Sequence, residues 1–534
     1  MLLTEARLSA PPAARLLKYH DLPALEREKK QFPEFVAVDL AHTAMLVEER
    51  IISAAVGRAI LQQLLAIRRL KPSDFPTDVR KGSFLLQVES YLFAAVGDDV
   101  GGHMHTGRSR IDQGATVRRL YKRNRLLNVM DRLNDLQDAI AEQAGRHART
   151  IMPGYTHMQH VQPWVFGHYL LSFSSRLHDS FQRLTEVWTR VNRNPLGAVG
   201  LAGTSWPLNR ARTTELLGFD GLVENSKLGR EAYYAAEAIA ALAFVMADLN
   251  DLATDLHVWS STEFGLVECD DSYCSTSSIF PQKKNPAGLE TIKKAAGSAV
   301  TWLATALASF RAEGTGDQAV RDLPLIDEAL TTTEGMLDLC TGVIETLIVH
   351  EDRMAASLEG SWCTSSNLAD VIVRERGLSF RQAHHIVARV VRNALAKGIG
   401  PNELTSALLD EAALETAGLE LKLGDQAVHD ALDPRRFVET RVTDGSVAPQ
   451  QVARLLARAQ CEREANRRWV AEARARLLRA QHQLDEAVER IVSPKRSHEI
   501  RSRRQTSENL QTISKDFPAW SGEAFGNEFQ RLMY

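Results

Sequence analysis

The residues best suited to chemistry stand in one run from Ser275 to Glu290, STSSIFPQKKNPAGLE. Small hydroxyl residues precede a lysine, and Pro286 then suits the first position of a helix, where its missing N–H costs nothing. The free N–H groups of such a helix start, with Lys283 and Asn285, could hold a carboxylate that gains negative charge during a reaction. Ser277 could then act as a base beside an anion site. The simpler alternative is a polar loop before a surface helix.

Two other segments, also predicted to be loops, are equally dense in small and polar residues. They are HMHTGRSRIDQ at 103–113 and PGYTHMQHVQP at 153–163, and each comes just before a predicted long helix. If these helices run parallel, their N-terminal ends would surround one anion pocket. Arg108 and Arg110 would add bidentate carboxylate binding. The three segments together predict an active site for an anionic substrate.

The elements that must position these segments are helices. Apolar residues recur every three or four positions through long stretches, as at Leu126, Met130 and Leu133. Helices near 30 residues would reach about 45 Å and usually lie side by side in a bundle. Alternation typical of a substantial sheet is missing, so we expect an all-α fold: a long central helix bundle with smaller helical N- and C-terminal domains. The long helices are predicted at 120–149, 164–191, 230–259 and 286–312.

Breaks rich in glycine and proline divide the chain. The predicted division is 1–118 as an N-terminal helical domain with the TGRSR loop, 119–365 as the central bundle, 366–470 as a small helical domain and 471–534 as an extension. The end of the extension is basic around Arg501. A nucleic-acid-binding arm is one interpretation, and a solvated tail or an arm packed on another subunit is the one we favour.

Composition limits the class of protein. The chain has 534 residues and a formal net charge of −3, so no global charge favours nucleic acid or a membrane as main partner. Five cysteines, odd in number and without a CxxC pair, suit a reduced cytoplasmic protein. The N-terminus lacks a signal-peptide core, and the most apolar segment, Ala235–Leu249, is too short to span a bilayer.

Read together, TGRSRIDQ, GYTHMQHVQP and TSSIFPQKKNPAGLE resemble the three signature regions of the fumarase/aspartase superfamily and, within it, of the argininosuccinate lyase family. The resemblance covers roughly residues 35–455. It implies a homotetramer in which each active site is assembled from three subunits. It also implies a lyase that reversibly eliminates an amine or alcohol from a succinyl group, here of an amino-acid-type substrate, to give fumarate.

The resemblance also implies roles for single residues. Ser277 would be the base, its oxyanion stabilised by backbone N–H groups and by Lys283. His157 would pair with Glu290 and serve the leaving nitrogen. The implied substrate-binding residues are Ser109, Arg110, Thr156, Gln159, Asn285 and Arg230.

Departures from the family pattern gather in the substrate pocket. Ile111 stands where the family has an asparagine that contacts a substrate carboxylate, and an isoleucine cannot donate that hydrogen bond. The other departures are Leu85, Thr276, Phe280, Ala287, Ala319 and Pro324. We therefore expect a related N-substituted aspartate with a bulkier or less polar leaving group. A genuine argininosuccinate lyase and a non-catalytic structural relative remain as alternatives.

Histidine pairs such as His103 and His105 have spacings that could ligate zinc. No cysteine or carboxylate joins them in a recognisable pattern, and no glycine-rich nucleotide motif occurs. We expect neither a metal nor a nucleotide cofactor.

Overall fold

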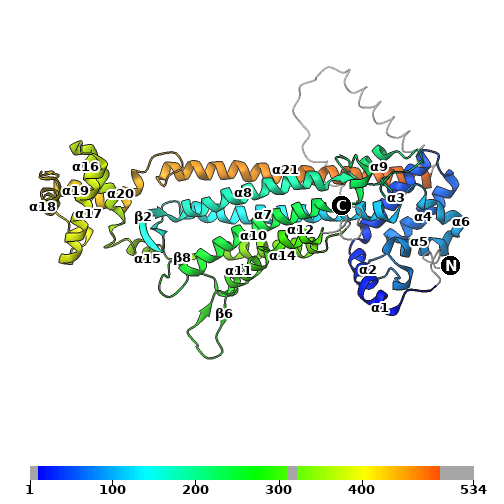
Figure 1. Cartoon of the computed structure of the whole chain (residues 1–534), viewed down its shortest axis with the longest axis horizontal. Coiled ribbons are helices and arrows are strands. Elements are labelled where there is room, and N and C mark those ends of the chain that lie inside the picture. Colours follow the sequence, from blue (N-terminus) through cyan, green and yellow to red (C-terminus); the bar gives the residue numbers. More distant parts are fainter. Residues whose placement is uncertain (1–9, 311–321, 494–534) are drawn as a thin grey trace, which may run out of the picture. The chain divides into compact units, whose positions relative to one another are not determined.

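The computed structural model describes residues 10–310 and 322–493. Over these ranges helices dominate, and strands pair only in twos (Figure 1). The predicted all-α fold is therefore confirmed. Ala319 and the basic end of the extension, including Arg501, lie outside the described residues. In the described ranges, no helix is both long and apolar enough to cross a bilayer.

The chain forms two compact units. Over the described residues, the first comprises 10–110, 204–218 and 478–493, and the second comprises 111–203, 219–310 and 322–477. These units interleave along the sequence, because α9 belongs to the first unit although it lies between helices of the second. The predicted four-part division of the chain stays a prediction.

Short and medium helices build the first unit around an aromatic core. Phe32, Phe75 and Phe84 are buried with ring centroids 5.3–5.7 Å apart, a spacing at which edge and tilted contacts are favourable. Helix α3 has apolar residues on every face and is accordingly buried along most of its length. The elements are α1 (Ala14–Leu16), η1 (Leu17–Asp21), α2 (Leu22–Lys29), α3 (Phe32–Glu48), α4 (Ala54–Arg68), η2 (Val79–Lys81), α5 (Phe84–Val96), α6 (Asp98–Gly101), η3 (Gly102–His105) and α9 (Arg210–Leu216).

Long helices build the second unit. In α7 the predicted apolar stripe is buried, including Leu126, Met130 and Leu133, and the periodic face explains why this segment packs as a helix. The helices are α7 (Arg110–Arg146), α8 (Phe166–Val191), α10 (Tyr233–Trp259), α11 (Ala287–Ala299), α12 (Trp302–Ser309), α14 (Leu325–Glu345), α15 (Glu351–Ala356) and, up to residue 477, α21 (Pro449–Val492), with η4 (Ser226–Arg230) and η5 (Asp271–Tyr273) in their connections.

Side-chain contacts fix the directions of these helices. Trp188 of α8 donates to the Arg123 carbonyl of α7, and Gln137 of α7 donates to the Ser174 carbonyl of α8. Residue numbers therefore rise along one helix as they fall along the other, so α7 and α8 are antiparallel. Helix α10 is antiparallel to α8 in turn, since Tyr169 bonds Asp255 while Ser180 bonds Asp248.

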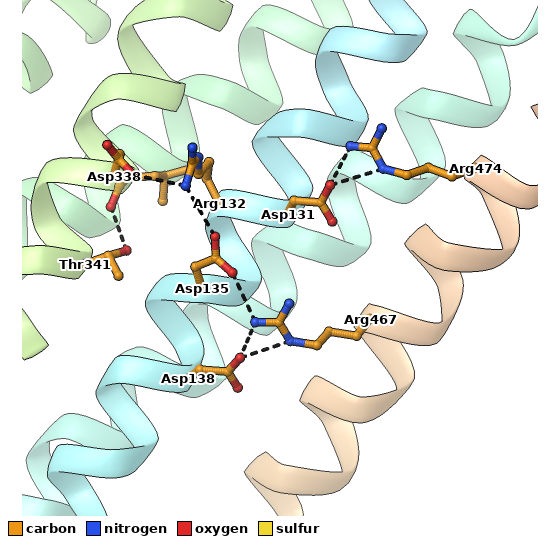
Figure 2. Close-up of polar contacts among 9 residues, drawn as sticks. Asp131, Arg132, Asp135, Asp138, Asp338, Thr341, Arg467 and Arg474 are labelled. Atoms are coloured by element: carbon orange, nitrogen blue, oxygen red, sulfur yellow. Dashed lines mark hydrogen bonds and ion pairs between the residues drawn. The ribbon is translucent and has the colours of Figure 1, made fainter. Parts of the chain in front are cut away.

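Arginines on α21 hold it against α7 (Figure 2). Arg467 bonds Asp135 at 3.1 Å and also Asp138, and Arg474 pairs with Asp131. The three aspartates stand at spacings of four and three, so they share one face of α7. Beneath them Val470 and Ala473 are buried, which adds apolar packing to the ion pairs.

A separate cluster of short helices follows with its own apolar core, in which Leu368, Ile386 and Leu409 are fully buried. Its elements are η6 (Trp362–Thr364), α16 (Ser365–Arg376), α17 (Phe380–Lys397), η7 (Pro401–Glu403), α18 (Ser406–Ala417), α19 (Asp425–Leu432) and α20 (Pro434–Glu439). Helix α17 begins with a capping box in which the Ser379 hydroxyl accepts from the Gln382 amide.

The structure corrects two predicted elements. The segment predicted as one helix over 286–312 is two helices, broken at Val300 and Thr301, and its first begins at Ala287. The segment predicted as a loop at 153–163 is a β-hairpin of β1 (Ile151–Thr156) and β2 (Gln159–Val165). The remaining strands are two-residue pairs: β3 (Arg193–Asn194) with β4 (Gly221–Leu222), β5 (Val267–Glu268) with β8 (Ile348–Val349), and β6 (Ser275–Thr276) with β7 (Lys284–Asn285).

Candidate active site

The segment around Ser277 is a loop closed by β6 and β7. These strands pair Ser275 with Asn285 and Thr276 with Lys284, and Figure 1 shows the loop projecting from its helices. At the start of the loop the Ser277 hydroxyl oxygen accepts from the amides of Ile279 at 3.2 Å and Phe280 at 3.0 Å. Two donors on one oxygen favour its deprotonated form.

Lys284 anchors this loop. Its ammonium group lies 2.7 Å from a carboxylate oxygen of Glu268 and 2.7 Å from one of Asp271. The hydrogen bond from Lys284 holds the pKa of the Glu268 carboxyl below its ordinary value. Glu268 also lies 3.4 Å from His350, so the root of the loop is tied to the β5–β8 pair.

Lys283 is exposed, and in the described ranges its side chain makes no hydrogen bond or ion pair, including to Ser277. Its backbone amide instead closes a turn by donating to the Phe280 carbonyl at 3.1 Å. The Asn285 amide donates to the Ser275 hydroxyl at 3.4 Å. The lysine charge is therefore available to an anion that enters beside the loop.

Glu290, on the first turn of α11, lies beside His257 rather than beside His157. The His257 Nε2 atom is 3.9 Å from a Glu290 carboxylate oxygen, and Lys293 lies 3.1 Å from His257 Nδ1. Because the lysine ammonium can only donate, Nδ1 accepts and Nε2 carries the hydrogen toward Glu290. The Glu290 side chain is 57% exposed, so it is open to a further partner.

The GYTH segment forms the tip of the β1–β2 hairpin. Thr156 pairs with Gln159, which leaves His157 and Met158 as the two central turn residues, with φ of 53° and 59°. Two positive φ values define a type I′ turn, which normally takes Asn-Gly. A histidine and a methionine held there are strained, and such strain concentrates at functional sites. The side chains of the turn and of the pair that closes it, Thr156, His157, Met158 and Gln159, are all exposed.

In the TGRSR segment, the two arginines have different environments. Arg108 is fully buried and its guanidinium lies 2.6 Å from Asp39, which contradicts the prediction that it binds a substrate carboxylate. His42 supports the same loop, since its Nε2 lies 2.9 Å from the Thr106 carbonyl. Arg110, the first residue of α7, is exposed, and Ser109 is half-buried.

Asp112 is a positioning residue that the sequence reasoning missed. Its buried carboxylate accepts from the amides of Gly197 at 2.8 Å and Val199 at 3.0 Å. Gly197 has a φ of 88° and Val199 a φ of 55°, so this loop takes a conformation that needs such anchoring. Asp112 and this loop both lie within residues 35–455, the range of the family resemblance, which is the signal that the sequence holds for them. Arg230, at the end of η4 just before α10, is buried.

The helix directions divide the candidate residues into two groups. Ile111 and Arg230 lie at the N-terminal ends of α7 and α10, where Arg119 stacks on Tyr234 at 4.0 Å. The GYTH hairpin follows the opposite end of α7, a helix of 37 residues and thus about 55 Å. The prediction that the helix starts surround one pocket is therefore wrong within a single chain.

Comparison with known proteins gives the family. The model for the lyase family matches residues 24–301, and that for the argininosuccinate lyase C-terminal region matches 362–439. The chain is 36% identical over 477 residues to the argininosuccinate lyase of Methanosarcina acetivorans, which covers 88% of this chain and 95% of the relative. The chain belongs to the argininosuccinate lyase family. It is a carbon–nitrogen lyase of the argininosuccinate lyase-like group.

Other proteins show a similar sequence identity to this chain. Argininosuccinate lyase 1 of Shouchella clausii is 33% identical, with 84% of this chain and 91% of the relative covered. Among solved structures, EDDS lyase in complex with formate is 34% identical with a TM-score of 0.82, covering 91% of this chain and 97% of that one. A variant of EDDS lyase with bound fumarate matches equally well.

Among the described residues, no group of three or more histidine, cysteine, aspartate or glutamate side chains is placed to hold a metal ion. The predicted histidine pair does not change this, since His105 lies 2.6 Å from a single carboxylate, that of Glu89.

Proposed function

We propose that this lyase eliminates an amine from an N-substituted aspartate, or a related succinyl adduct, with Ser277 as the base. The observation that carries the proposal is the pair of amides, from Ile279 and Phe280, that donate to the Ser277 oxygen. A serine holds its proton too tightly for this work unless its oxyanion is stabilised, and two preorganised donors supply that stabilisation.

The reaction begins when Ser277 removes a proton from the carbon beside a substrate carboxylate. The electron pair moves into that carboxylate, and Lys283, Asn285 and the start of α11 stabilise the doubly charged group. The pair then returns to form the carbon–carbon double bond as the carbon–nitrogen bond breaks. The departing nitrogen takes a proton from the His157–Glu290 pair. The substrate is held by Ser109, Arg110, Thr156, Gln159 and Arg230.

The assembly we propose is a homotetramer in which three copies contribute to each site. Its support is that one chain holds the TGRSR and GYTH segments at opposite ends of α7. Apolar side chains are exposed on two helices that pack together and at the break before the second: Phe244 (53%) on α10, Val300 (81%) at the break, and Leu303 (39%) and Leu307 (52%) on α12. Exposed apolar surface of this kind marks a contact with another chain.

Mixed assemblies test the sharing of sites. Co-expressed His157→Ala and Ser277→Ala copies should regain about one quarter of the wild-type activity, because residues 157 and 277 would come from different copies. A mixture of Ser277→Ala with Lys283→Met is the control, since both changes lie on one loop and no site escapes both. No recovery in the first mixture would refute shared sites.

The favoured substrate has a less polar leaving group than argininosuccinate. Ile111 supports this, because it is half-buried at the α7 start where the family places an asparagine. Leu85, buried in α5, offers no polar group either. Argininosuccinate itself is the second candidate, favoured by 36% identity over nearly the whole length of a curated argininosuccinate lyase.

Release of fumarate, followed by its ultraviolet absorption, separates these candidates. Ser277→Ala should lower turnover of the true substrate by about 10²–10⁴-fold, the usual contribution of a general base, while the neighbouring exposed hydroxyl in Ser278→Ala serves as control. Equal activity of both variants would refute Ser277 as the base. Rapid, Ser277-dependent cleavage of argininosuccinate would refute the altered substrate, and no reaction with any amine plus fumarate would favour the non-catalytic alternative.

The five cysteines, all present as free thiols, support a reducing cytoplasmic location.

A further inference from the structure

A cavity of about 330 Å³ lies beneath the GYTH hairpin, away from its tip. One wall is the root of the hairpin, and the other is the end of α20 with the segment that leads into α21. The lining residues are Gly154, Tyr155, Val161, Gln162, Pro163, Trp164, Phe437, Arg441, Ser446 and Val447. None of the residues proposed for the elimination lines it. Its volume falls at the lower end of the range for small-molecule sites.

The cavity combines an apolar lining with one cation. The Arg441 guanidinium lies over the Phe437 ring at 3.8 Å, a cation–π contact. Its two terminal nitrogens both donate to the neutral Asn367 amide oxygen at 3.2 Å, and the carboxylate of Asp370 is 4.0 Å away. Burial lowers the pKa of Arg441. The positive charge is thus only partly compensated by the protein.

Hydrogen bonds fix the second wall of the cavity, the segment that leads from α20 into α21. The Ser446 hydroxyl donates to the Thr443 carbonyl at 2.6 Å, and Gln451 donates to the Val442 carbonyl at 2.9 Å. These contacts fold the segment between α20 and α21 into a fixed turn.

A histidine connects that turn to Trp164 at the root of the hairpin. Trp164 donates its indole N–H to His168 Nδ1 at 2.8 Å, so the hydrogen of His168 is on Nε2, which lies 2.9 Å from the Gly445 carbonyl. Both walls therefore stand ready before any ligand enters, which lowers the entropic cost of binding.

We propose that this cavity binds a small carboxylate with a flat apolar body, at a site separate from the one that carries out the elimination. The carboxylate would lie on the open side of the Arg441 guanidinium, where a charge-assisted hydrogen bond replaces water. The body would rest against the rings of Tyr155 and Trp164. Because Thr156 ends the strand that contains Tyr155 and His157 follows in the turn, an occupant would also steady the hairpin tip.

Indole-3-acetate and its uncharged amide are suitable probes, measured by calorimetry on the full-length protein. We expect the acid to bind and the amide to bind at least about tenfold more weakly, the value of one hydrogen bond to a charged group. Arg441→Met should weaken binding of the acid by a similar factor and leave the affinity for the amide unchanged. Arg454→Met is the matched control, because Arg454 pairs with Asp444 on the same turn but does not line the cavity.

A second variant keeps the test independent of Arg441. Val161 is 45% exposed at the hairpin and lines the cavity, so Val161→Trp should fill the space and abolish binding without disturbing the core. Saturating fumarate and the Ser277→Ala change should both leave binding intact, since they act on the other site. No binding to the wild-type protein, equal binding of acid and amide, or displacement by fumarate would overturn the proposal.

Discussion

His42 provides a direct test of how the TGRSR loop is supported. The side chain is completely buried in α3 and its Nε2 lies 2.9 Å from the Thr106 carbonyl. Desolvation, and next the nearby charge of Arg108, hold the pKa of His42 well below its ordinary value of 6.5. The folded first unit therefore keeps this histidine neutral, whereas the unfolded chain titrates it normally.

This difference in proton binding makes the stability of the folded first unit depend on pH. Below pH 6.5 the unfolded state binds a proton that the folded state does not, so this contribution to stability is complete above pH 6.5 and is lost as the pH falls. With a folded state that takes up no proton down to pH 5.5, the loss between pH 7.5 and pH 5.5 is about 1.4 kcal/mol, the full titration of an ordinary histidine in the unfolded chain. This corresponds to a rise of about tenfold in the equilibrium constant for opening α3.

Native-state hydrogen exchange of peptides from α3 measures that constant. The variant His42→Gln retains a donor for Thr106 but cannot titrate, so comparing it with the wild type at each pH cancels the intrinsic pH dependence of exchange. The wild type should lose about tenfold more protection than the variant over this range. His20→Gln, which changes an exposed histidine of the same unit, should behave as wild type. Parallel pH profiles for wild type and His42→Gln would refute the reasoning.

Three further predictions concern stability and the loops. Asp112→Ala should lower the free energy of unfolding by about 2–4 kcal/mol, because the buried Gly197 amide and the half-buried Val199 amide lose their acceptor. Asp112→Asn should cost less in the same thermal denaturation assay, and equal costs would contradict this account. Lys284→Met should increase proteolysis of the loop that contains Ser277. Lys283→Met should abolish elimination and leave the rate of proteolysis unchanged. The reverse pattern would show that the two lysines have been assigned the wrong roles. Met158→Asn should stabilise the hairpin by about 0.5–1 kcal/mol, since asparagine tolerates positive φ, and unchanged or lower protection of β1 in hydrogen exchange would count against a strained turn.

Periodic apolar residues made the long helices predictable. The stripes of α7 and α8 bury one face each, and the hydrophobic pattern carries that information locally. The break at Val300 and Thr301 was not predictable in this way, because neither residue is a glycine or proline and the apolar pattern continues through it. The hairpin was also missed, since its prolines and glycine at 153, 154 and 163 are typical of loops.

Residue type alone could not assign roles within the candidate site. Arg108 and Arg110 flank Ser109 in one motif, yet one is buried against Asp39 and the other is exposed. The difference depends on α3, nearly 70 positions earlier in the sequence, and no local pattern carries it. The same holds for Asp112, whose partners lie at 197 and 199.

The contacts between α21 and α7 also constrain how the chain is made. Their hydrogen-bonded partners are 325 to 346 residues apart in the sequence. During synthesis on the ribosome, Asp131, Asp135 and Asp138 therefore face water until more than three hundred further residues have been added. The three aspartates keep this face of α7 charged and hydrated while α21 is still missing. A charged face disfavours association with other chains until Arg467 and Arg474 have been synthesised and pair with it.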